Sequence, residues 1–189
     1  MLPRLIGLSG KMGSGKDAVV EYLVNEYGYR RLAFADAVKH ELEAAIRHKA
    51  YPDGMPLSLW EDMLESAPEE VWIKPLNDRI RRLAQWWGTD YRRMDHEDYW
   101  VELAEKEIDK HPEVRFAISD VRYGNEDRLV HRRGGVVWMV RRKNRSNVNG
   151  IEGHISESLA NVKPNHVLSN DGTLEELYRT VDDLVSGVV

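Results

Sequence analysis

The sequence predicts an α/β protein built on a parallel sheet. Short apolar runs alternate with longer segments whose apolar residues recur at helical spacing, which is typical of strands joined by crossover helices. A glycine-rich loop, Gly10–Asp17, separates the first apolar run from the first helical segment. A later run, Val136–Val140, is almost entirely apolar, as expected of a strand covered on both faces. With 189 residues, of which 42% are hydrophobic, the chain suits one domain with a substantial core.

The first half of the chain is expected to begin with two strand–helix pairs. Residues 4–8 are rich in strand formers, and residues 18–24 carry apolar side chains at helical spacing. Residues 29–34 indicate a second strand, and residues 36–49 a second helix. The apolar side chains of that helix share one face: Val38, Leu42, Ala45 and Ile46.

A mostly helical block is predicted between residues 58 and 110. The segment 51–56, with two prolines and a glycine, ends the preceding helix. Breaks inside the block are expected near Pro68, Pro75 and Gly88. The block also holds most of the tryptophans, which makes it the place to look for a site that binds a flat ligand.

The second half is expected to supply three more strands, at residues 114–119, 136–140 and 166–168. Residues 125–133 suit a helix that two glycines stop. The basic and polar segment 141–153 is expected to form a loop or flap. Thr173 and Glu176 have the spacing of a capping box, which predicts the start of a terminal helix.

Composition narrows the class of protein. A net charge of −5 argues against a dedicated nucleic-acid-binding protein, although arginines cluster in several places. The absence of cysteine excludes disulfides, thiolate catalysis and cysteine metal sites. No apolar run reaches the length of a membrane span and no secretory signal fits before the first strand, so we expect a cytoplasmic protein that does not bind membranes. The apolar excess of the middle block leaves a homodimer open.

The glycine-rich loop has the composition of a phosphate cradle. Its glycines let backbone N–H groups converge on phosphate oxygens, and the following helix adds the positive end of its dipole. Lys16 supplies a mobile charge for the outer phosphates. The expected phosphate contacts are Gly10, Lys11, Gly13, Ser14, Gly15, Lys16 and Asp17. The alternative is a glycine-rich turn that binds nothing.

Two carboxylates are expected near a metal ion. Asp17 stands where a Ser or Thr hydroxyl usually meets Mg²⁺, and a carboxylate can hold this ion directly or through water. Alternatively, Asp17 only complements the helix N-terminus electrostatically. Asp120, which ends the strand at 114–119, is the second candidate; its alternative role is to cap the helix that follows.

Residues that directly follow parallel strands meet at the carboxyl edge of the sheet, where ligands bind. This rule selects, besides the loop, Asp36, Asp120, Arg122, Arg141 and Arg142. Arg122 is expected to grip a phosphate, or else to pair with Glu126. Arg141 and Arg142 are expected to neutralise charge on a moving phosphoryl group, a solvated basic loop being the alternative. Acids for a metal beside arginines for phosphates favour phosphoryl transfer.

A further group of residues suits a nucleotide pocket. Arg82 and Gln85 lie on one helical face that leads to Trp86, which offers an arginine for a phosphate, an amide for a base edge and an aromatic ring for stacking. Arg92 or Arg93 is expected to add a phosphate contact.

Three more side chains are expected to face the substrate. Asp36 and Lys39, one helical turn apart, suit a sugar hydroxyl and the surroundings of a phosphate, although Asp36 serves equally well as an N-cap. His154 lies in the flap and is expected to fix its geometry or to contact the nucleotide.

Segments throughout the chain resemble the phage-type deoxynucleoside monophosphate kinases, a family of P-loop nucleoside monophosphate kinases. In order, they are Gly15-Lys16-Asp17, Phe34–Lys39, Gln85–Asp90, Asp98–Trp100, Ile118–Glu126 and His154–Glu157. The resemblance covers nearly the whole chain. It implies a P-loop kinase fold over residues 1–189: a five-stranded parallel sheet flanked by helices, a helical substrate-binding insert at about 51–110 and a basic lid at about 141–157.

The resemblance also implies an enzyme that uses ATP and Mg²⁺ to phosphorylate a deoxynucleoside 5′-monophosphate, encoded by a bacteriophage and acting in the host cytoplasm. It gives catalytic roles to Lys16, Asp120, Arg122, Arg141 and Arg142. The substrate-binding residues are then Asp36, Lys39, Arg82, Gln85, Trp86, Arg92 and His154, with Asp17 and Asp120 at the metal. The chain departs from the family at Ala18, where Thr is common, and at Gly124, where proline is frequent.

Two other functions stay open at this point. A kinase of the same fold can phosphorylate 5-hydroxymethyluracil within phage DNA, which would make DNA the partner, although the acidic charge of this chain disfavours that. A nucleotide-binding regulator without catalysis is the other alternative, suggested only by Asp17-Ala18. Dephospho-coenzyme A kinase is a more distant option.

Overall fold

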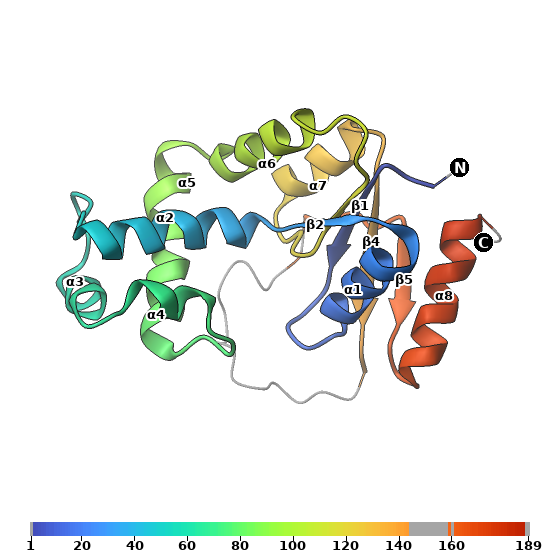
Figure 1. Cartoon of the computed structure of the whole chain (residues 1–189), viewed down its shortest axis with the longest axis horizontal. Helices are drawn as coiled ribbons and strands as arrows, with labels where there is room; N and C mark the ends of the chain where they lie inside the picture. Colours follow the sequence, from blue (N-terminus) through green and yellow to red (C-terminus); the bar gives the residue numbers. More distant parts are fainter. Residues whose placement is uncertain (1, 144–158, 160, 188–189) are drawn as a thin grey trace. The chain divides into compact units, whose positions relative to one another are not determined.

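The fold is given by a computed structural model that describes residues 2–143, 159 and 161–187. The chain forms two compact units (Figure 1): Met1–Ala33 with Ala104–Val189, and Phe34–Leu103. The first unit carries a five-stranded parallel sheet flanked by helices, and the second is helical. The predicted α/β class is confirmed.

The sheet of the first unit has its earliest strand at the centre. Its strands are β1 (Leu5–Ser9), β2 (Arg30–Leu32), β3 (Phe116–Ile118), β4 (Val136–Arg141) and β5 (His166–Ser169). They lie in the order β2-β3-β1-β4-β5, and every neighbouring pair is parallel. All five residues of β1 are buried, because strands flank it on both edges and side chains cover both its faces. The carboxyl ends of all five strands therefore meet at one edge.

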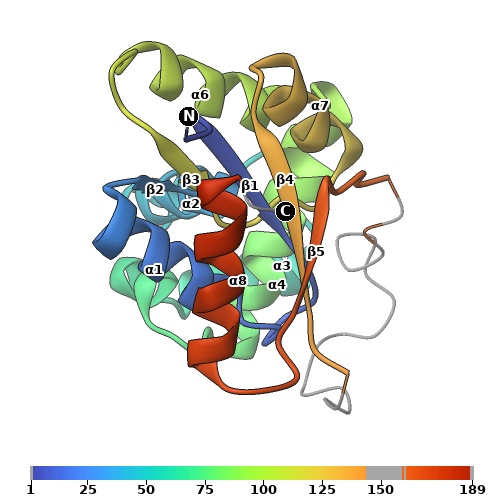
Figure 2. The same cartoon turned by 90° about the vertical axis from the view of Figure 1, so that its right-hand side faces the viewer.

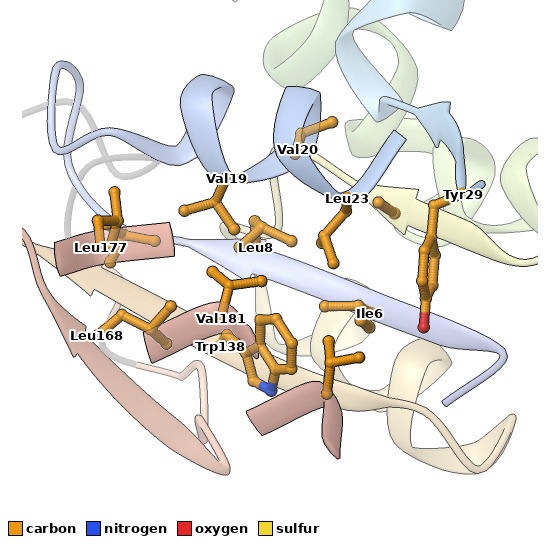
Figure 3. Packing of buried hydrophobic residues seen from close by; sticks show 13 residues of the cluster. Ile6, Leu8, Val19, Val20, Leu23, Tyr29, Trp138, Leu168, Leu177 and Val181 are labelled. Atoms are coloured by element: carbon orange, nitrogen blue, oxygen red, sulfur yellow. The ribbon is translucent and has the colours of Figure 1, made fainter. Parts of the chain in front are cut away.

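One face of this sheet packs on α1 (Lys16–Tyr27) and α8 (Leu174–Ser186), which lie side by side in Figure 2. Figure 3 shows Ile6 and Leu8 of β1 meeting Leu23 of α1 and Val181 of α8. Alternate residues of a strand point to opposite faces, so Ile6 and Leu8 serve the same layer.

The other face packs closely on α7 (Gly124–Arg132). A Cβ on Gly7 would lie 2.9 Å from a methyl of Val121 and 3.0 Å from a methyl of Val130, so no side chain fits there. Glycine in the central strand thus lets α7 approach the sheet next to the residues that follow β3.

The second unit consists of short helices around a longer one. They are α2 (Phe34–His48), α3 (Leu57–Leu64), the 3₁₀ helix η1 (Pro68–Trp72), α4 (Asp78–Gln85), the π-helix η2 (Trp86–Tyr91) and α5 (Arg92–Asp95). The helix α6 spans Tyr99–Asp109. The unit contains most of the segment 51–110 in which the sequence suggested a substrate-binding insert.

The break expected at Gly88 is wrong. The chain passes through Gly88 in the π-helix that continues α4, so the helix widens there instead of ending. A Cβ at this position would lie 3.3 Å from a methyl of Val38, and the Gly88 carbonyl accepts the indole N–H of Trp100 at 2.8 Å. Glycine here permits close packing between helices rather than a turn.

Element boundaries differ from the sequence-based expectation by a few residues. The second strand covers only Arg30–Leu32, and α2 begins at Phe34 instead of residue 36. Tyr29 lies outside the strand because its backbone N–H donates to the carbonyl of Leu23 in α1 and not to a neighbouring strand. The predicted capping box of α8 is confirmed, since Thr173 and Glu176 exchange both capping hydrogen bonds. Within the described ranges, no helix combines the length and hydropathy needed to cross a bilayer.

Two tyrosines join α1 to α8 through one carboxylate. The hydroxyls of Tyr22 and Tyr27 donate to the same oxygen of Asp182, at 2.8 and 2.7 Å. Tyr22 also stacks on Tyr178, with ring centroids 4.2 Å apart. The hydrogen bond to Asp182, with a smaller contribution from burial, raises the pKa of both Tyr22 and Tyr27 to about 12.

We predict that this contact makes stability depend on pH in the alkaline range. Because the folded-state pKa of each hydroxyl lies above the ordinary value of 10, the contact stabilises the protein below pH 10 and is lost as pH rises towards 12. The difference in unfolding free energy between the wild type and a Tyr22→Phe, Tyr27→Phe double variant should shrink over this interval. Urea denaturation of both proteins across the interval measures it, and a constant difference would contradict the prediction.

Candidate functional site

The loop between β1 and α1 requires glycine at three positions. Gly10, Gly13 and Gly15 have φ angles of 137°, 74° and 109°, which side-chain-bearing residues rarely adopt. A Cβ on Gly10 would also lie 2.3 Å from the carbonyl oxygen of Val140, at the end of β4. The loop therefore lies close against the carboxyl edge of the sheet.

Asn170, which directly follows β5, holds this loop from beneath. Its side-chain amide is buried and donates to the carbonyl of Ser14 at 2.8 Å, while its backbone N–H donates to the carbonyl of Arg141 at 2.7 Å. A Cβ on Gly15 would lie 2.3 Å from the same amide nitrogen. Asn170 thus ties the loop to the ends of β4 and β5.

Lys16 lies over the loop that precedes it. Its ammonium group donates to the carbonyls of Gly10 at 2.6 Å and Lys11 at 2.9 Å. The charge is thereby held at the mouth of the loop and at the start of α1, where the positive end of the helix dipole lies.

Two serine hydroxyls beside the loop are buried without a hydrogen-bond partner among the described residues, those of Ser9 and Ser14. The Ser14 oxygen lies 2.9 Å from the position that a Cβ on Gly10 would take. An unpaired buried hydroxyl costs about 1 to 3 kcal/mol. The glycine-rich backbone, the ammonium of Lys16 and these hydroxyl donors fit an anionic phosphate group.

The two predicted metal carboxylates both belong to the first unit. Asp17 is exposed in the first turn of α1, and Asp120 is half-buried directly after β3. The backbone N–H of Val121 donates to the carbonyl of Leu8 at 2.9 Å, which holds Asp120 beside the end of β1 where the glycine loop begins. The alternative role of Asp120 as a helix cap is excluded, because α7 begins four residues later with Tyr123 as its N-cap.

The carboxylates of Asp17 and Asp120 suit Mg²⁺, which accepts oxygen ligands and keeps several waters. The described ranges hold no cluster of three or more acidic, His or Cys side chains that would enclose a metal by itself. A cation here would therefore draw part of its coordination from water or phosphate.

The backbone at Arg122 is fixed by a buried acid that the sequence suggested as its ion-pair partner. The carboxylate of Glu126 accepts the backbone N–H groups of Arg122 at 2.7 Å and of Tyr123 at 3.1 Å. Glu126 is only 2% exposed, so it sets the path of the chain between β3 and α7. Arg122 itself is half-buried at this point.

The structure describes only the first part of the expected lid. Arg141 is the last residue of β4, and its Nε lies 3.3 Å from the sulfur of Met139; Arg142 follows, and both side chains are exposed. Asp171 accepts the backbone N–H of Lys143 at 2.6 Å. His154 and the rest of the lid lie outside the described residues.

In the second unit, the predicted substrate residues have different surroundings. Arg82 donates from Nε and Nη2 to the two oxygens of Asp62, at 2.9 and 2.7 Å, so its fork holds a carboxylate of the protein. The ammonium of Lys39 lies 5.2 Å from the ring centre of Trp72. Asp36 lies within the first turn of α2 and is not its N-cap, because the helix begins at Phe34.

The two adjacent tryptophans separate into a buried and a half-buried residue. Trp87 is 4% exposed, whereas Trp86 is half-buried and stacks on Tyr91 with ring centroids 5.4 Å apart and planes within 4°. Gln85 ends α4 beside them and is also half-buried. Of the pair, Trp86 is thus the ring with a face that a ligand can reach.

Glu41 of α2 gathers three donors from later helices. Its carboxylate accepts the hydroxyl of Tyr99, the indole N–H of Trp87 at 3.0 Å and the Nε of Arg92 at 2.7 Å. Burial and then the hydrogen bond to Glu41 raise the pKa of the Tyr99 hydroxyl. Burial lowers the pKa of Arg92, but the hydrogen bond and charge of Glu41 outweigh this effect.

Sequence reasoning missed Glu41 and Asn170. Glu41 had a signal: it lies on the apolar face of its helix, together with Val38 and Ala45, and a carboxylate there must find donors. For Asn170, the sequence gives no signal beyond its place after a strand, since Asn170-Asp171-Gly172 has the composition of an ordinary turn.

The amino-acid sequence matches one family model and one curated protein. Residues 69–181 match the sequence model of a family described as deoxynucleotide monophosphate kinase. A protein of Acanthamoeba polyphaga mimivirus, named as a candidate deoxynucleotide monophosphate kinase, is 28% identical over 192 aligned positions that cover 94% of this chain and 93% of that protein.

Solved structures give more remote likenesses. A Thermus thermophilus protein known from its crystal structure is 19% identical over the full length of both chains, with a TM-score of 0.49. Dephospho-CoA kinase from Campylobacter jejuni is 12% identical over 98% of this chain and 97% of its own, with a TM-score of 0.48.

We predict that Gly15→Ala lowers the free energy of unfolding by about 3 kcal/mol, because the methyl group both strains the backbone and collides with Asn170. Gly28→Ala is the matched control: Gly28 also has a positive φ, of 66°, but nothing lies within 4 Å of its would-be Cβ. That variant should lose only about 1 to 2 kcal/mol. Chemical denaturation compares the two, and equal losses would show that the contact with Asn170 is unimportant.

Proposed function

The chain belongs to the deoxynucleotide monophosphate kinase family, and we propose that it transfers the γ-phosphate of ATP to the 5′-phosphate of a deoxynucleoside monophosphate, with Mg²⁺. An oxygen of the acceptor phosphate forms a bond to the γ-phosphorus, the bond from that phosphorus to the β–γ bridging oxygen breaks, and two nucleoside diphosphates result. The observation that carries the proposal is the clamped glycine loop with Lys16 at its mouth.

The first unit supplies the residues for the phosphate donor. Backbone N–H groups from Gly10 to Asp17 would bind the phosphates, and Lys16 would exchange its two loop carbonyls for phosphate oxygens. This exchange keeps the ammonium paired in both states. Because the loop is already held by Val140 and Asn170, little ordering of the backbone is needed on binding.

Asp17 and Asp120 would hold Mg²⁺, which when bound neutralises charge on the donor phosphates. Asp120 is the stronger candidate for direct contact, because the Val121–Leu8 hydrogen bond fixes its backbone next to the start of the loop. Arg122, Arg141 and Arg142 follow strands at the same edge and would stabilise the charge that spreads over the transferring group.

The second unit would bind the acceptor. Trp86 offers an aromatic face for a base, Gln85 an amide for a base edge, and Arg92 a cation for the phosphate. Lys39, Arg82 and Asp36 would contribute charge and hydrogen bonds nearby, with Arg82 acting from its pair with Asp62.

We predict that Lys16→Ala reduces turnover of deoxynucleoside monophosphates by about 10²- to 10³-fold, since it removes one preorganised charge from the phosphate site. The measurement is ADP release from ATP with each of the four natural deoxynucleoside monophosphates, with and without Mg²⁺. Lys110→Ala is the control, because Lys110 is exposed directly after α6 and, among the described residues, its ammonium pairs with Glu107.

The same assay includes duplex DNA that contains 5-hydroxymethyluracil. Turnover with DNA alone would replace the proposed acceptor, and no turnover with any acceptor would contradict the proposed reaction.

We predict that Asp120→Asn raises the Mg²⁺ concentration needed for half-maximal turnover by about tenfold, the lower end of the effect of disturbing a metal site. Magnesium titration of the wild type, of this variant and of Asp17→Asn separates the two carboxylates. Asp183→Asn, in α8, is the matched control. An unchanged magnesium requirement in Asp120→Asn would exclude Asp120 from the metal site.

A further inference from the structure

Among the described residues, the hydrogen bond that holds the guanidinium of Arg92 lies at one of its edges. Its guanidinium carries five N–H donors in a planar fork, and the Nε donor is used by Glu41 at 2.7 Å. The described part of the chain places no hydrogen-bond acceptor on Nη1 or Nη2. The side chain is 32% exposed, so these two nitrogens remain available to a ligand.

Two tyrosine rings restrict the plane of this guanidinium. Its central carbon lies 4.7 Å from the ring centre of Tyr91 and 4.9 Å from that of Tyr99. Tyr99 is in turn fixed by its own hydrogen bond to Glu41, and Tyr91 by stacking on Trp86. Arg92 is therefore preorganised in both position and orientation before a ligand arrives.

The contrast with Arg82 identifies the ligand that Arg92 can take. Arg82 donates two parallel hydrogen bonds, from Nε and Nη2, to the carboxylate of Asp62. Arg92 gives Glu41 only its Nε and keeps Nη1 and Nη2 side by side, a pair that suits a dianion with several oxygens such as a phosphate monoester. The aromatic surface of Trp86 and Tyr91 beside it suits a flat base.

We propose that Glu41 is a positioning residue that aims Arg92 at the 5′-phosphate of the acceptor nucleotide. Both carboxylate oxygens of Glu41 accept hydrogen bonds, from Tyr99, Trp87 and Arg92. One side chain therefore fixes the position of the arginine, of the Tyr99 ring beside it and of the buried Trp87 ring. This inference rests on the proposed function and specifies how its acceptor is held.

The α2 helix offers a matched control for Glu41. Glu43, two residues later, also accepts a tryptophan indole N–H, from Trp72 at 2.8 Å, and an arginine, Arg47 at 2.7 Å. Arg47 lies one turn away on the same helix and is 56% exposed, so this second group has the same chemistry without the tyrosine rings. Glu43→Gln thus repeats the loss of charge at a carboxylate whose arginine, Arg47, has no proposed contact with the nucleotide.

The test measures how much the phosphate contributes to binding. Calorimetry without ATP gives the dissociation constants of the four natural deoxynucleoside monophosphates and of the matching deoxynucleosides. We expect the wild type to prefer the monophosphate, and we expect this preference to fall about tenfold in Glu41→Gln and in Arg92→Lys, the size of one charge-assisted hydrogen bond. Glu43→Gln should retain it. In turnover, Glu41→Gln should raise the KM of the acceptor and leave the KM of ATP unchanged.

Equal weakening of monophosphate and deoxynucleoside in Glu41→Gln, or an equal effect of Glu43→Gln, would overturn the inference and leave the proposed function intact. Conversely, a phosphate preference that depends on Glu41 and Arg92 in a protein without turnover would support the inference and contradict the proposed function. If Glu41→Gln fails to fold, an unchanged phosphate preference in Arg92→Lys would still overturn the inference, because Arg92 is partly exposed and its replacement keeps the charge.

Discussion

The close approach of the glycine loop to the ends of β4 and β5 is the constraint on which the first unit depends. The carbonyl oxygen of Val140 occupies the space where a side chain on Gly10 would lie, and the amide nitrogen of Asn170 does the same for Gly15. This contact fixes the loop that leads into α1. The ammonium of Lys16 and the hydroxyl of Ser14 lie within that loop, and the backbone next to Asp120 is bonded to the strand from which the loop starts.

Acidic side chains explain how an arginine-rich chain carries a net negative charge and still keeps cations for phosphates. Asp62 accepts from two nitrogens of Arg82, and Glu105 and Asp109 together accept from all three nitrogens of Arg133. Glu41, in contrast, engages Arg92 at a single nitrogen. The number of donors that each acid leaves unused, rather than the number of arginines, therefore separates structural cations from those that can bind a ligand.

The parts of the fold that sequence predicted are those encoded by neighbouring residues. The strands, the glycine loop and the capping box of α8 each depend on a few consecutive side chains, and all three appear where expected. Gly88 misled because glycine serves close packing as well as turns, and only the contact with Val38 distinguishes the two. The hydrogen-bond partners of Glu41 lie 46 to 58 residues away in the sequence. The sequence therefore indicates on which face of its helix Glu41 lies, but not which donors it holds.

The hydrogen bond from Asn170 to Ser14 joins residues separated by 156 positions. During synthesis, the glycine loop is made well before the residue that supports it. The hydrogen bond that holds the loop, and the edge strand β5 beside it, can form only after Asn170 has emerged from the ribosome, since so distant a pairing requires the intervening chain to be ordered. A nascent chain truncated before residue 170 would carry the whole phosphate-binding sequence without a loop able to hold its shape.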